Sequence, residues 1–444
     1  MDYKNYFYQN LDDLKKLLSI NSIYDEASVS LDAPYGKGVK DALLFMKDLA
    51  LKNGFNVKNY NNEVFTINYI DKSNSRFDIA SHLDVVSVDN SWSVDPFSPV
   101  IKEGKLFGRG TADMKTAAFL TYLALKLLKE NYPETKNEIR LVLGSDEERT
   151  MNDMRHYFAE VNEPLFAFSP DGVFPMCIGE KGALMWTLNG NYDGIIEKLE
   201  GGIQCNVVSP ICEATLKNNL YTNKICEYIC KNGIDGVARE INGKTVVTIK
   251  GIAVHSSRNF LGRNAIDDAL RIIKDICDDP IAKNLSEVFD NDYGEGLGIK
   301  KISDENFLTV NLGLLKISDN KLYGQVDGRY PDYLTSEELT KKLKEKCILD
   351  VTLDYDDKPS GCKIDDQYVQ ALLQTYKEIT KDETKPFVSG GVSYSKVFNH
   401  SVTFGPGKLT KENLAHQKDE YIEIDDAIEA LEIYYKTFEK LAFM

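Results

Sequence analysis

The chain has 444 residues and a mass of 50.1 kDa, a length that predicts two or three domains with a sizeable core. Apolar residues make up 43% and charged residues 27%, the balance of a soluble globular protein rather than a disordered one. Lysine and arginine total 53 against 69 aspartate and glutamate, which gives a net charge of −16. Because this charge would repel nucleic acid and anionic membranes, neither is expected as a partner.

The sequence carries no targeting or disulfide signal. No stretch approaches the roughly 18 uninterrupted apolar residues that a membrane helix needs, and the opening MDYKN lacks the basic and apolar regions of a signal peptide. Eight cysteines are scattered through a chain too large to need disulfides, so we expect a cytoplasmic protein with reduced thiols. Cys205, Cys212, Cys226 and Cys230 lack the paired spacing of a zinc site and are interpreted as ordinary buried thiols.

Helical and strand-like patterns alternate through the first 180 residues. The apolar periodicity predicts helices over 12–20, 39–52 and 116–128. Residues rich in β-branched and aromatic side chains predict strands over 64–70, 77–86, 138–144 and 165–168. Strands that alternate with helices predict an α/β fold, with a mostly parallel central sheet flanked by helices.

The pattern changes after about residue 182. Strand-like runs at 183–188, 245–250 and 307–315, with helices at 262–277 and 336–347, indicate an inserted α+β unit over residues 183–357. The first pattern then returns, with a helix over 365–379, a glycine-rich turn at 389–391, a strand over 402–405 and a closing helix over 425–441. We therefore expect one α/β domain, residues 1–182 and 358–444, interrupted by a smaller insert.

A histidine and an aspartate stand at the end of a predicted strand. His82 and Asp84 are two positions apart, so on a strand they would project from the same face. Ligand sites form at the ends of parallel strands, and a metal-binding imidazole usually gives its other N–H to a carboxylate such as Asp84. The short H-x-D pattern is equally compatible with chance.

Carboxylates follow the other strands and turns of the α/β domain. Asp113 lies in the glycine-rich turn GRGTADMK, which lacks the phosphate-loop pattern and could simply cap a helix. Glu147 and Glu148 end an acidic run, GSDEE, that a solvated turn would also tolerate, and Asp171 follows the next strand. With His82 and the late His416, this set without cysteine suits a hydrolytic centre of two zinc, cobalt or manganese ions.

The order of these motifs resembles that of the M20 family of metallopeptidases and, within it, the bacterial dipeptidases of the PepV type. The resemblance covers nearly the whole chain. Its motifs here are SHLDVV (81–86), GRGTADMK (108–115), GSDEE (144–148), FSPDGVFPMCIGEKG (168–182), GIAVHSS (251–257), DGRYP (327–331), GGVSY (390–394) and AHQKDEY (415–421). Each motif alone is modest, and the specificity comes from eight of them in one order.

The resemblance implies a catalytic domain that binds two divalent metal ions, with zinc expected and manganese or cobalt as alternatives. By motif, Asp113 corresponds to the carboxylate that bridges both ions, and its peptide bond to Met114 is expected to be cis. The ligands of one ion correspond to His82 and Asp171, and those of the other to Glu148 and His416. Glu147 corresponds to the general base, and Asp84 to the carboxylate that steadies His82.

The resemblance also implies that residues 183–357 form a lid that binds substrate. His255 corresponds to the residue that polarises the scissile carbonyl, and Arg329 to the residue that grips the C-terminal carboxylate of the substrate. Asn206 and Gly391 are looser matches for substrate contacts. Arg149 and Thr150 follow the glutamate pair where relatives commonly have small residues, which leaves the rim of the pocket, and so the substrate preference, less defined.

The function implied is metal-dependent hydrolysis of dipeptides by a monomeric cytoplasmic enzyme. One alternative is another activity of the M20 type, an N-acyl-amino-acid deacylase or a carboxypeptidase, which would keep the metal centre and differ in the group that the lid recognises. A second is an inactive binding protein of the same fold. The presence of all five expected ligands and the expected base argues against that second alternative.

Overall fold

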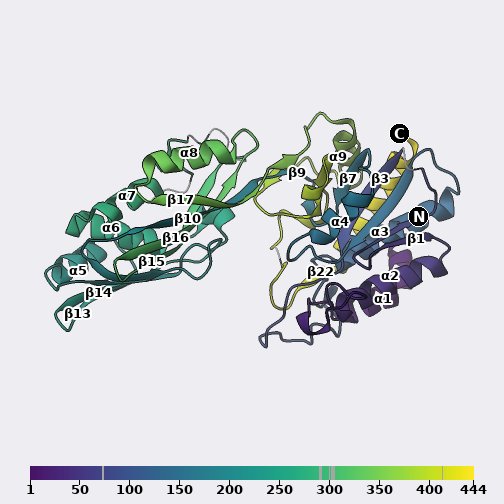
Figure 1. Cartoon of the computed structure of the whole chain (residues 1–444). Helices are drawn as coiled ribbons and strands as arrows, with labels where there is room; N and C mark the ends of the chain where they lie inside the picture. The colour runs from purple at the N-terminus through teal and green to yellow at the C-terminus, as the bar shows by residue number, and fades with distance from the viewer. Residues whose placement is uncertain (73–74, 290–292, 300, 302–305, 413) are drawn as a thin grey trace. The chain divides into compact units, whose positions relative to one another are not determined.

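The structure is a computed structural model that describes residues 1–72, 75–289, 293–299, 301, 306–412 and 414–444 (Figure 1). The chain forms two compact units. The first comprises Met1–Gly179, Gly361–Phe387 and Val392–Met444, and the second comprises Glu180–Ser360 with Val388–Gly391. The expected insert, residues 183–357, falls within the second unit, which also takes in the glycine-rich turn.

The first unit combines α-helices with short strands. Its described helices are α1 (Tyr3–Ser19), α2 (Lys37–Lys52), α3 (Lys115–Asn131), α4 (Asn152–Glu160), α9 (Gln367–Thr380) and α10 (Ile424–Phe443), with the 3-10 turns η1 (Glu26–Ser28) and η4 (Tyr394–Val397). Its described strands are β1 (Asn56–Tyr60), β2 (Val64–Asn68), β3 (Arg76–His82), β4 (Val100–Lys102), β5 (Lys105–Phe107), β6 (Glu138–Gly144), β7 (Phe166–Ser169), β8 (Gly172–Phe174), β9 (Cys177–Glu180), β20 (Ser401–Thr403), β21 (Pro406–Lys408) and β22 (Tyr421–Glu423).

A nine-stranded sheet runs through this unit in the order β1-β2-β6-β3-β7-β20-β9-β18, with β19 paired to β9. Strands β18 (Ser360–Gly361) and β19 (Phe387–Ser389) lie where the chain passes between the units. β3 pairs in parallel with β6 and β7, and β20 pairs in parallel with β7, whereas β1, β2 and β9 join antiparallel. The expected α/β fold with a parallel centre is confirmed.

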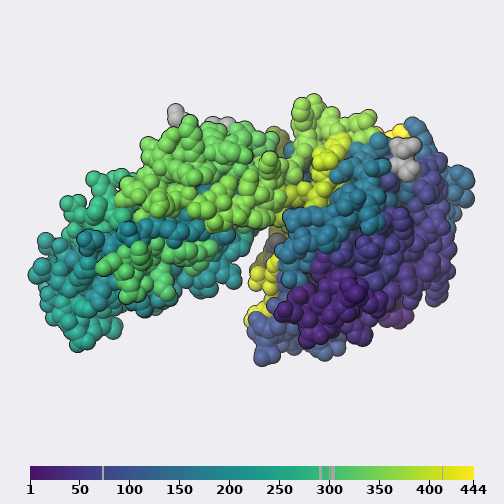
Figure 2. All heavy atoms as spheres, in the orientation of Figure 1, coloured from purple at the N-terminus to yellow at the C-terminus, as the bar shows by residue number. Residues whose placement is uncertain are grey.

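Both faces of the sheet are buried, as the apolar runs of its central strands require. Ile79 packs in the large core that includes residues of α1, α2, α3, α9 and α10. Its neighbour Ala80 points to the opposite face and joins a smaller core with Met154 of α4 and Tyr394 of η4. Figure 2 shows the N-terminal residues, in purple, on the outer surface of this unit.

The parallel strands place three loops at one edge of the sheet. His82, the last residue of β3, is in register with Gly144, the last residue of β6. β7 ends nearby at Ser169 and is the other parallel neighbour of β3. The residues that follow these strands therefore converge at the carboxyl edge, where α/β folds form their sites.

The second unit is built on an eight-stranded antiparallel sheet, in the order β13-β14-β12-β11-β15-β16-β10-β17. The strands are β10 (Gly182–Asn191), β11 (Ile196–Gly201), β12 (Ile211–Leu216), β13 (Gly236–Ile241), β14 (Lys244–Lys250), β15 (Thr309–Ser318), β16 (Lys321–Tyr330) and β17 (Asp350–Asp357). The described helices are α5 (Thr222–Lys231), α6 (Ala265–Cys277), α7 (Pro280–Phe289) and α8 (Ser336–Lys346), with η2 (Ser256–Leu261) and η3 (Glu295–Leu297).

One hydrophobic core holds this second unit together. Ile249 and Leu312 of the sheet pack with Ile266 of α6, Leu285 of α7 and Leu339 of α8. Figure 1 shows these helices along one side of the sheet. Several strands alternate between buried and exposed residues, the pattern of an antiparallel sheet with one face in the core.

Several expectations from the sequence need correction. The first helix begins at Tyr3 rather than at residue 12, because the Asp2 side chain accepts a hydrogen bond from the Asn5 N–H and Phe7 is buried in the core. β3 ends at His82 rather than at residue 86. The N–H of the next residue, Leu83, donates to Gly144 O. All eight cysteines are free, but Cys226 and Cys230 are exposed rather than buried.

No helix within the described ranges is both long enough and apolar enough to cross a membrane.

Candidate functional site

The carboxyl edge of the first sheet brings together the candidate residues of the first unit. Around the Nε2 atom of His82, the carboxylate oxygens of Asp113, Asp171 and Glu147 lie at 3.2, 3.5 and 3.7 Å. His82 is fully buried at the end of β3. Asp113 precedes α3, Glu147 follows β6 and Asp171 follows β7, so four separate segments converge on one imidazole.

The other ring nitrogen of His82 defines its tautomer. Nδ1 lies 3.0 Å from the backbone carbonyl oxygen of Asp84, an atom that can only accept, so Nδ1 carries the proton. The Asp84 carboxylate lies 3.4 Å from the same nitrogen and also accepts from the Glu148 N–H at 3.0 Å. In the neutral ring, Nε2 therefore presents its lone pair to the three carboxylates.

His416 and Asp113 form the second half of this cluster. The His416 Nε2 atom lies 3.1 Å from Asp113 Oδ2 and 3.0 Å from Glu148 Oε2. Because Asp113 Oδ1 faces His82, the two oxygens of one carboxylate face two different histidines. The Asp113–Met114 peptide bond is cis, as the resemblance implies.

Burial and mutual repulsion perturb the titration of these groups. Burial, together with the neighbouring carboxylates, raises the pKa of Glu147 well above its usual range, and burial also raises the pKa of Asp171 and Glu148. Burial would raise the pKa of Asp113 as well, but the imidazoles of His416 and His82 beside it lower it overall. The hydrogen bonds that His416 makes with Asp113 and Glu148 raise the pKa of His416 to about 10.

The donor set fits divalent cations. Within the described part of the chain, His82 Nε2 and Glu148 Oε1 are buried without a hydrogen-bond partner. A buried lone pair facing carboxylates is unfavourable unless a positive charge lies between them. The groups that could each hold an ion are His82–Asp113–Asp171, His82–Glu147–Glu148 and Asp113–Glu148–His416. Imidazole and carboxylate ligands without thiolate suit zinc, manganese or cobalt.

Glu420, a residue that the sequence analysis did not single out, binds the backbone of the segment that carries Asp113. Its carboxylate is fully buried and accepts from the backbone N–H groups of Ala112 and Asp113, at 2.6 and 3.0 Å. Arg109 Nη1 donates to the other oxygen at 2.6 Å. Arg109 and Glu420 lie in two of the motifs given above, but their pairing across 311 residues leaves no signal in the sequence.

A second buried carboxylate holds the turn that carries the glutamate pair. Asp153, at the start of α4, accepts from the Ser145 and Asp146 N–H groups, at 2.6 and 3.2 Å, and from the Tyr394 hydroxyl. A Cβ atom on Gly144 would lie 2.3 Å from the Tyr394 hydroxyl and 2.6 Å from Asp153 Oδ2, so only glycine fits there. This arrangement fixes the direction in which Glu147 and Glu148 leave β6.

The remaining candidate residues lie in the second unit, and three of them belong to neighbouring segments. Asn206 O accepts from Ser256 N–H at 2.9 Å, and Val207 pairs with His255 in an isolated bridge. Burial by the surrounding protein, together with the charge of Arg329, lowers the pKa of His255. His255 is therefore a neutral imidazole at neutral pH, although the residue is exposed to solvent.

Arg329 is already engaged within its own strand. Its Nε and Nη2 atoms donate to the two oxygens of Asp327 at 3.0 and 3.1 Å, and Ser256 donates to Asp327 Oδ1 at 2.6 Å. The side edge of the guanidinium is thus committed to Asp327. A planar carboxylate could still be met by the opposite edge, Nη1 and Nη2.

Gly391 lies in the turn that returns to the second unit. Its N–H donates to Ser389 Oγ at 2.9 Å. At the preceding Gly390, a Cβ atom would lie 2.6 Å from the Cβ of Ser257, which is two residues after His255. Gly390 therefore lets this turn approach the His255 segment closely.

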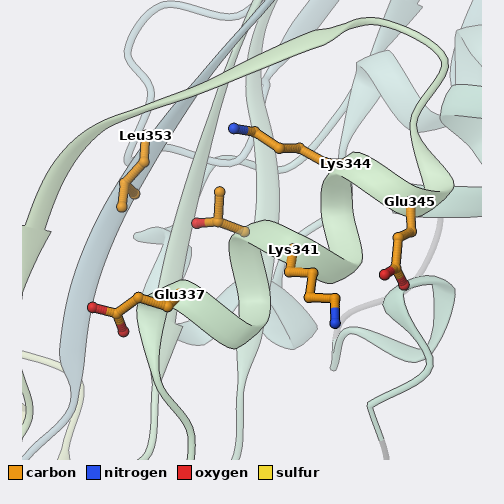
Figure 3. A pocket seen from close by; sticks show the side chains of 6 residues that line it. Glu337, Lys341, Lys344, Glu345 and Leu353 are labelled. Atoms are coloured by element: carbon orange, nitrogen blue, oxygen red, sulfur yellow. The ribbon is translucent and has the colours of Figure 1, made fainter.

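Other features of the chain lie outside these clusters. A surface hollow between α8 and β17 is lined by charged side chains with Thr340 and Leu353, and it contains none of the candidate residues (Figure 3). His156 pairs with Glu63 at 2.9 Å, and His400 lies between Leu165 O and Asp366. Both histidines serve local structure.

This chain resembles known proteins along almost its whole length. A "Putative dipeptidase" of Staphylococcus epidermidis is 30% identical over 457 residues, which cover 98% of this chain and 96% of that protein. A putative dipeptidase of Staphylococcus aureus is likewise 30% identical over 457 residues, covering 98% of this chain and 97% of the relative. These relatives match almost end to end.

Solved structures share the fold. The M20 family metallo-carboxypeptidase Sso-CP2 from Sulfolobus solfataricus is 17% identical with a TM-score of 0.56, covering 98% of this chain and 99% of the other. Human carnosine dipeptidase 1 is 14% identical with a TM-score of 0.56, covering 99% of each chain. At these identities the likeness concerns the fold alone.

The fold and its cluster of histidines and carboxylates define a metallohydrolase. The sequence model of peptidase family M20/M25/M40 matches residues 79–440 of this chain, a span that includes every candidate site residue. The chain therefore belongs to the M20/M25/M40 peptidase family.

Proposed function

We propose that this protein is a dipeptidase that uses two divalent metal ions, with zinc the first expectation and manganese or cobalt as alternatives. The observation that carries the proposal is the buried Nε2 atom of His82, which lies 3.2, 3.5 and 3.7 Å from carboxylate oxygens of Asp113, Asp171 and Glu147. The near end-to-end likeness to proteins named as dipeptidases supports the choice of substrate.

In this proposal, five side chains hold the ions. Asp113 is shared between them, with the other ligands supplied by His82, Asp171, Glu148 and His416. Bound divalent cations supply Lewis acidity and lower the pKa of water towards neutrality. Asp84 keeps the His82 proton on Nδ1, which leaves Nε2 available as a ligand.

Glu147 acts as the general base. Its carboxylate is nearly buried and reaches the same space as His82 Nε2 without needing to be a ligand. It takes a proton from the attacking water and passes it to the amine that leaves when the peptide bond breaks. His255 donates a hydrogen bond to the carbonyl oxygen as negative charge develops there. Arg329 binds the C-terminal carboxylate, and Asn206 and Gly391 contact the peptide.

The division of labour between the units follows from these roles. We assign the catalytic role to residues 1–182 and 358–444 and the role of a substrate-binding lid to residues 183–357. A lid that recognises the carboxylate at a set distance from the metals would accept dipeptides and reject longer chains. A monomeric, cytoplasmic enzyme acting on free small peptides remains our expectation.

Chelation and reconstitution test this function directly. The protein is stripped with a chelator, given Zn²⁺, Mn²⁺ or Co²⁺ separately, and assayed on dipeptides, tripeptides and N-acyl amino acids. Restored cleavage of dipeptides but not of tripeptides supports the proposal and identifies the working metal. Activity on acyl amino acids alone would show a deacylase, and inactivity with metals bound would show a binding protein.

A further inference from the structure

The histidine proposed to polarise the carbonyl makes two contacts with one neighbour. His255 Nδ1 lies 3.2 Å from the backbone N–H of Ser257 and 2.8 Å from its hydroxyl oxygen. A backbone N–H can only donate, so Nδ1 must accept and carries no proton. The hydroxyl then donates to the same nitrogen. In the neutral imidazole, the proton is left on Nε2.

The charges around the ring favour the neutral form. Arg329 and Arg258 disfavour a positive charge on His255, and Asp327 favours it only in part because it is paired with Arg329. Protonation of Nδ1 would also turn the Ser257 N–H contact into one donor facing another. The neutral Nε2–H form is therefore held by geometry and by charge.

The glycine turn explains how Ser257 keeps its position. A Cβ atom at Gly390 would lie 2.6 Å from the Ser257 Cβ and 3.3 Å from its Oγ. The absence of a side chain at residue 390 therefore lets the turn pack directly against the Ser257 side chain. A side chain at residue 390 would therefore disturb the hydrogen bond between Ser257 and His255, although residue 390 belongs to a distant segment of the chain.

We propose that Ser257 is a positioning residue that locks His255 in the Nε2–H tautomer, so that His255 serves as a neutral hydrogen-bond donor and not as a proton acceptor. The proposal rests on the proposed function for its catalytic meaning. A neutral donor stabilises the developing oxyanion while keeping its proton, which leaves the proton transfers to Glu147. The opposite tautomer would present a lone pair to that oxygen and repel it.

The tautomer can be read by NMR of the full chain labelled with ¹⁵N-histidine. The chain has only five histidines, and a His255→Asn variant identifies the His255 signals by their loss. Zinc-loaded protein is titrated between pH 5 and 8. The expected spectrum at pH 7 shows a protonated Nε2 and an unprotonated Nδ1, with a midpoint below the ordinary histidine value.

Variants of Ser257 separate positioning from folding. Ser257→Ala loses the 2.8 Å hydroxyl contact and keeps only the longer backbone contact of 3.2 Å, so part of the His255 population is expected to shift to the other tautomer. The kcat for a dipeptide should fall about 3- to 10-fold, as for one hydrogen bond, with KM little changed. Ser257→Thr restores the hydroxyl and should restore both the tautomer and kcat. Gly390→Ala should move the His255 signals in the same direction as Ser257→Ala.

Three results would overturn the proposal. They are a proton on Nδ1 at pH 7 in the unaltered protein, a His255 spectrum that Ser257→Ala leaves unchanged, and a Ser257→Thr variant as impaired as Ser257→Ala. Because the tautomer is observed without substrate, its failure is distinct from a failure of the dipeptidase activity.

Discussion

Glu420 holds Asp113 by its backbone rather than by its side chain. One oxygen of the buried Glu420 carboxylate accepts from the Asp113 N–H at 3.0 Å and from the N–H before it at 2.6 Å. Glu420 also lies four residues after His416, whose ring faces the Asp113 carboxylate at 3.1 Å. Two contacts therefore join the segments that carry Asp113 and His416. One is between the two candidate ligands, and the other is between the Glu420 carboxylate and the Asp113 backbone.

The Glu420→Gln substitution should weaken metal binding. An amide would turn an N–H toward either the Asp113 backbone or Arg109, all of which are donors, so the segment would shift. Loss of such supporting contacts costs about 10- to 100-fold in metal affinity. Isothermal titration of the stripped protein with Zn²⁺ measures the effect. Glu423→Gln, on the same segment but paired with Lys411 at the surface, is the matched control and should bind like the unaltered protein.

The Glu147→Gln substitution should remove turnover while leaving metal binding in place. A general base contributes about 10²–10⁴-fold to the rate, so kcat for a dipeptide should fall by that factor. The neighbouring Glu148→Gln variant should instead lose zinc affinity, since its carboxylate faces His416 at 3.0 Å. Metal content and initial rates, measured on both variants, separate the two roles. Near-normal turnover in Glu147→Gln would reject it as the base.

The Arg329→Ala substitution should discriminate between two forms of substrate. A hydrogen bond to a charged group is worth about 1.5–3 kcal/mol, so KM for a dipeptide should rise roughly 10- to 100-fold. A dipeptide amide lacks the carboxylate, and its KM should change much less. Paired kinetic measurements on both substrates check this, and equal losses on the two would remove Arg329 as the carboxylate-binding residue.

The Asp78→Asn substitution should destabilise the first unit. Asp78 is fully buried and accepts from Arg76 Nε at 3.0 Å and from Arg140 Nε and Nη2 at 3.0 and 2.7 Å. Removing its charge takes away the buried carboxylate that both guanidinium groups contact, and breaking such a buried pair costs about 3–5 kcal/mol in the free energy of unfolding. Urea unfolding followed by circular dichroism measures the loss.

The control for this experiment is an exposed ion pair in the same unit. Asp41 pairs with Lys37 on the surface of α2, and such pairs contribute about 0–1 kcal/mol. Asp41→Asn should therefore unfold at nearly the same urea concentration as the unaltered chain. Equal stability of the Asp78 and Asp41 variants would contradict the assigned weight of the buried network.

The sequence predicted best those elements whose local pattern agrees with their burial. The strand over 138–144 has the predicted bounds because every one of its residues is buried and it stops at a glycine. Of the residues expected near the metals, His82 ends β3, and Asp84, Glu147, Glu148 and Asp171 follow β3, β6 and β7, which are parallel neighbours. Asp113 and His416 reach the same place from loops before α3 and β22. The first helix was predicted too short because its first turns are stabilised by tertiary packing. Phe7 is buried in the core, and Tyr3 and Tyr6 pack against that core.

Contacts between residues far apart in the chain could not be predicted from local sequence patterns. Nothing near residue 109 indicates that Arg109 will meet Glu420, and nothing near residue 153 indicates that Asp153 will orient the turn at 144–148. Asp84 reaches His82 mainly through its backbone carbonyl, since β3 ends before the alternation of a strand could apply. Such contacts depend on how the strands are ordered, which local patterns do not encode.

The place of β20 in the first sheet sets the order in which this protein can be completed during translation. β20, residues 401–403, lies between β7 and β9, which precede it by more than 200 residues. A chain still attached to the ribosome at residue 360 has the whole sheet of the second unit available, while β7 still has an unpaired edge. His416 and Glu420 emerge later still. Metal loading at the proposed centre must therefore await the synthesis of residues 416–420, after the substrate-binding unit has had time to fold.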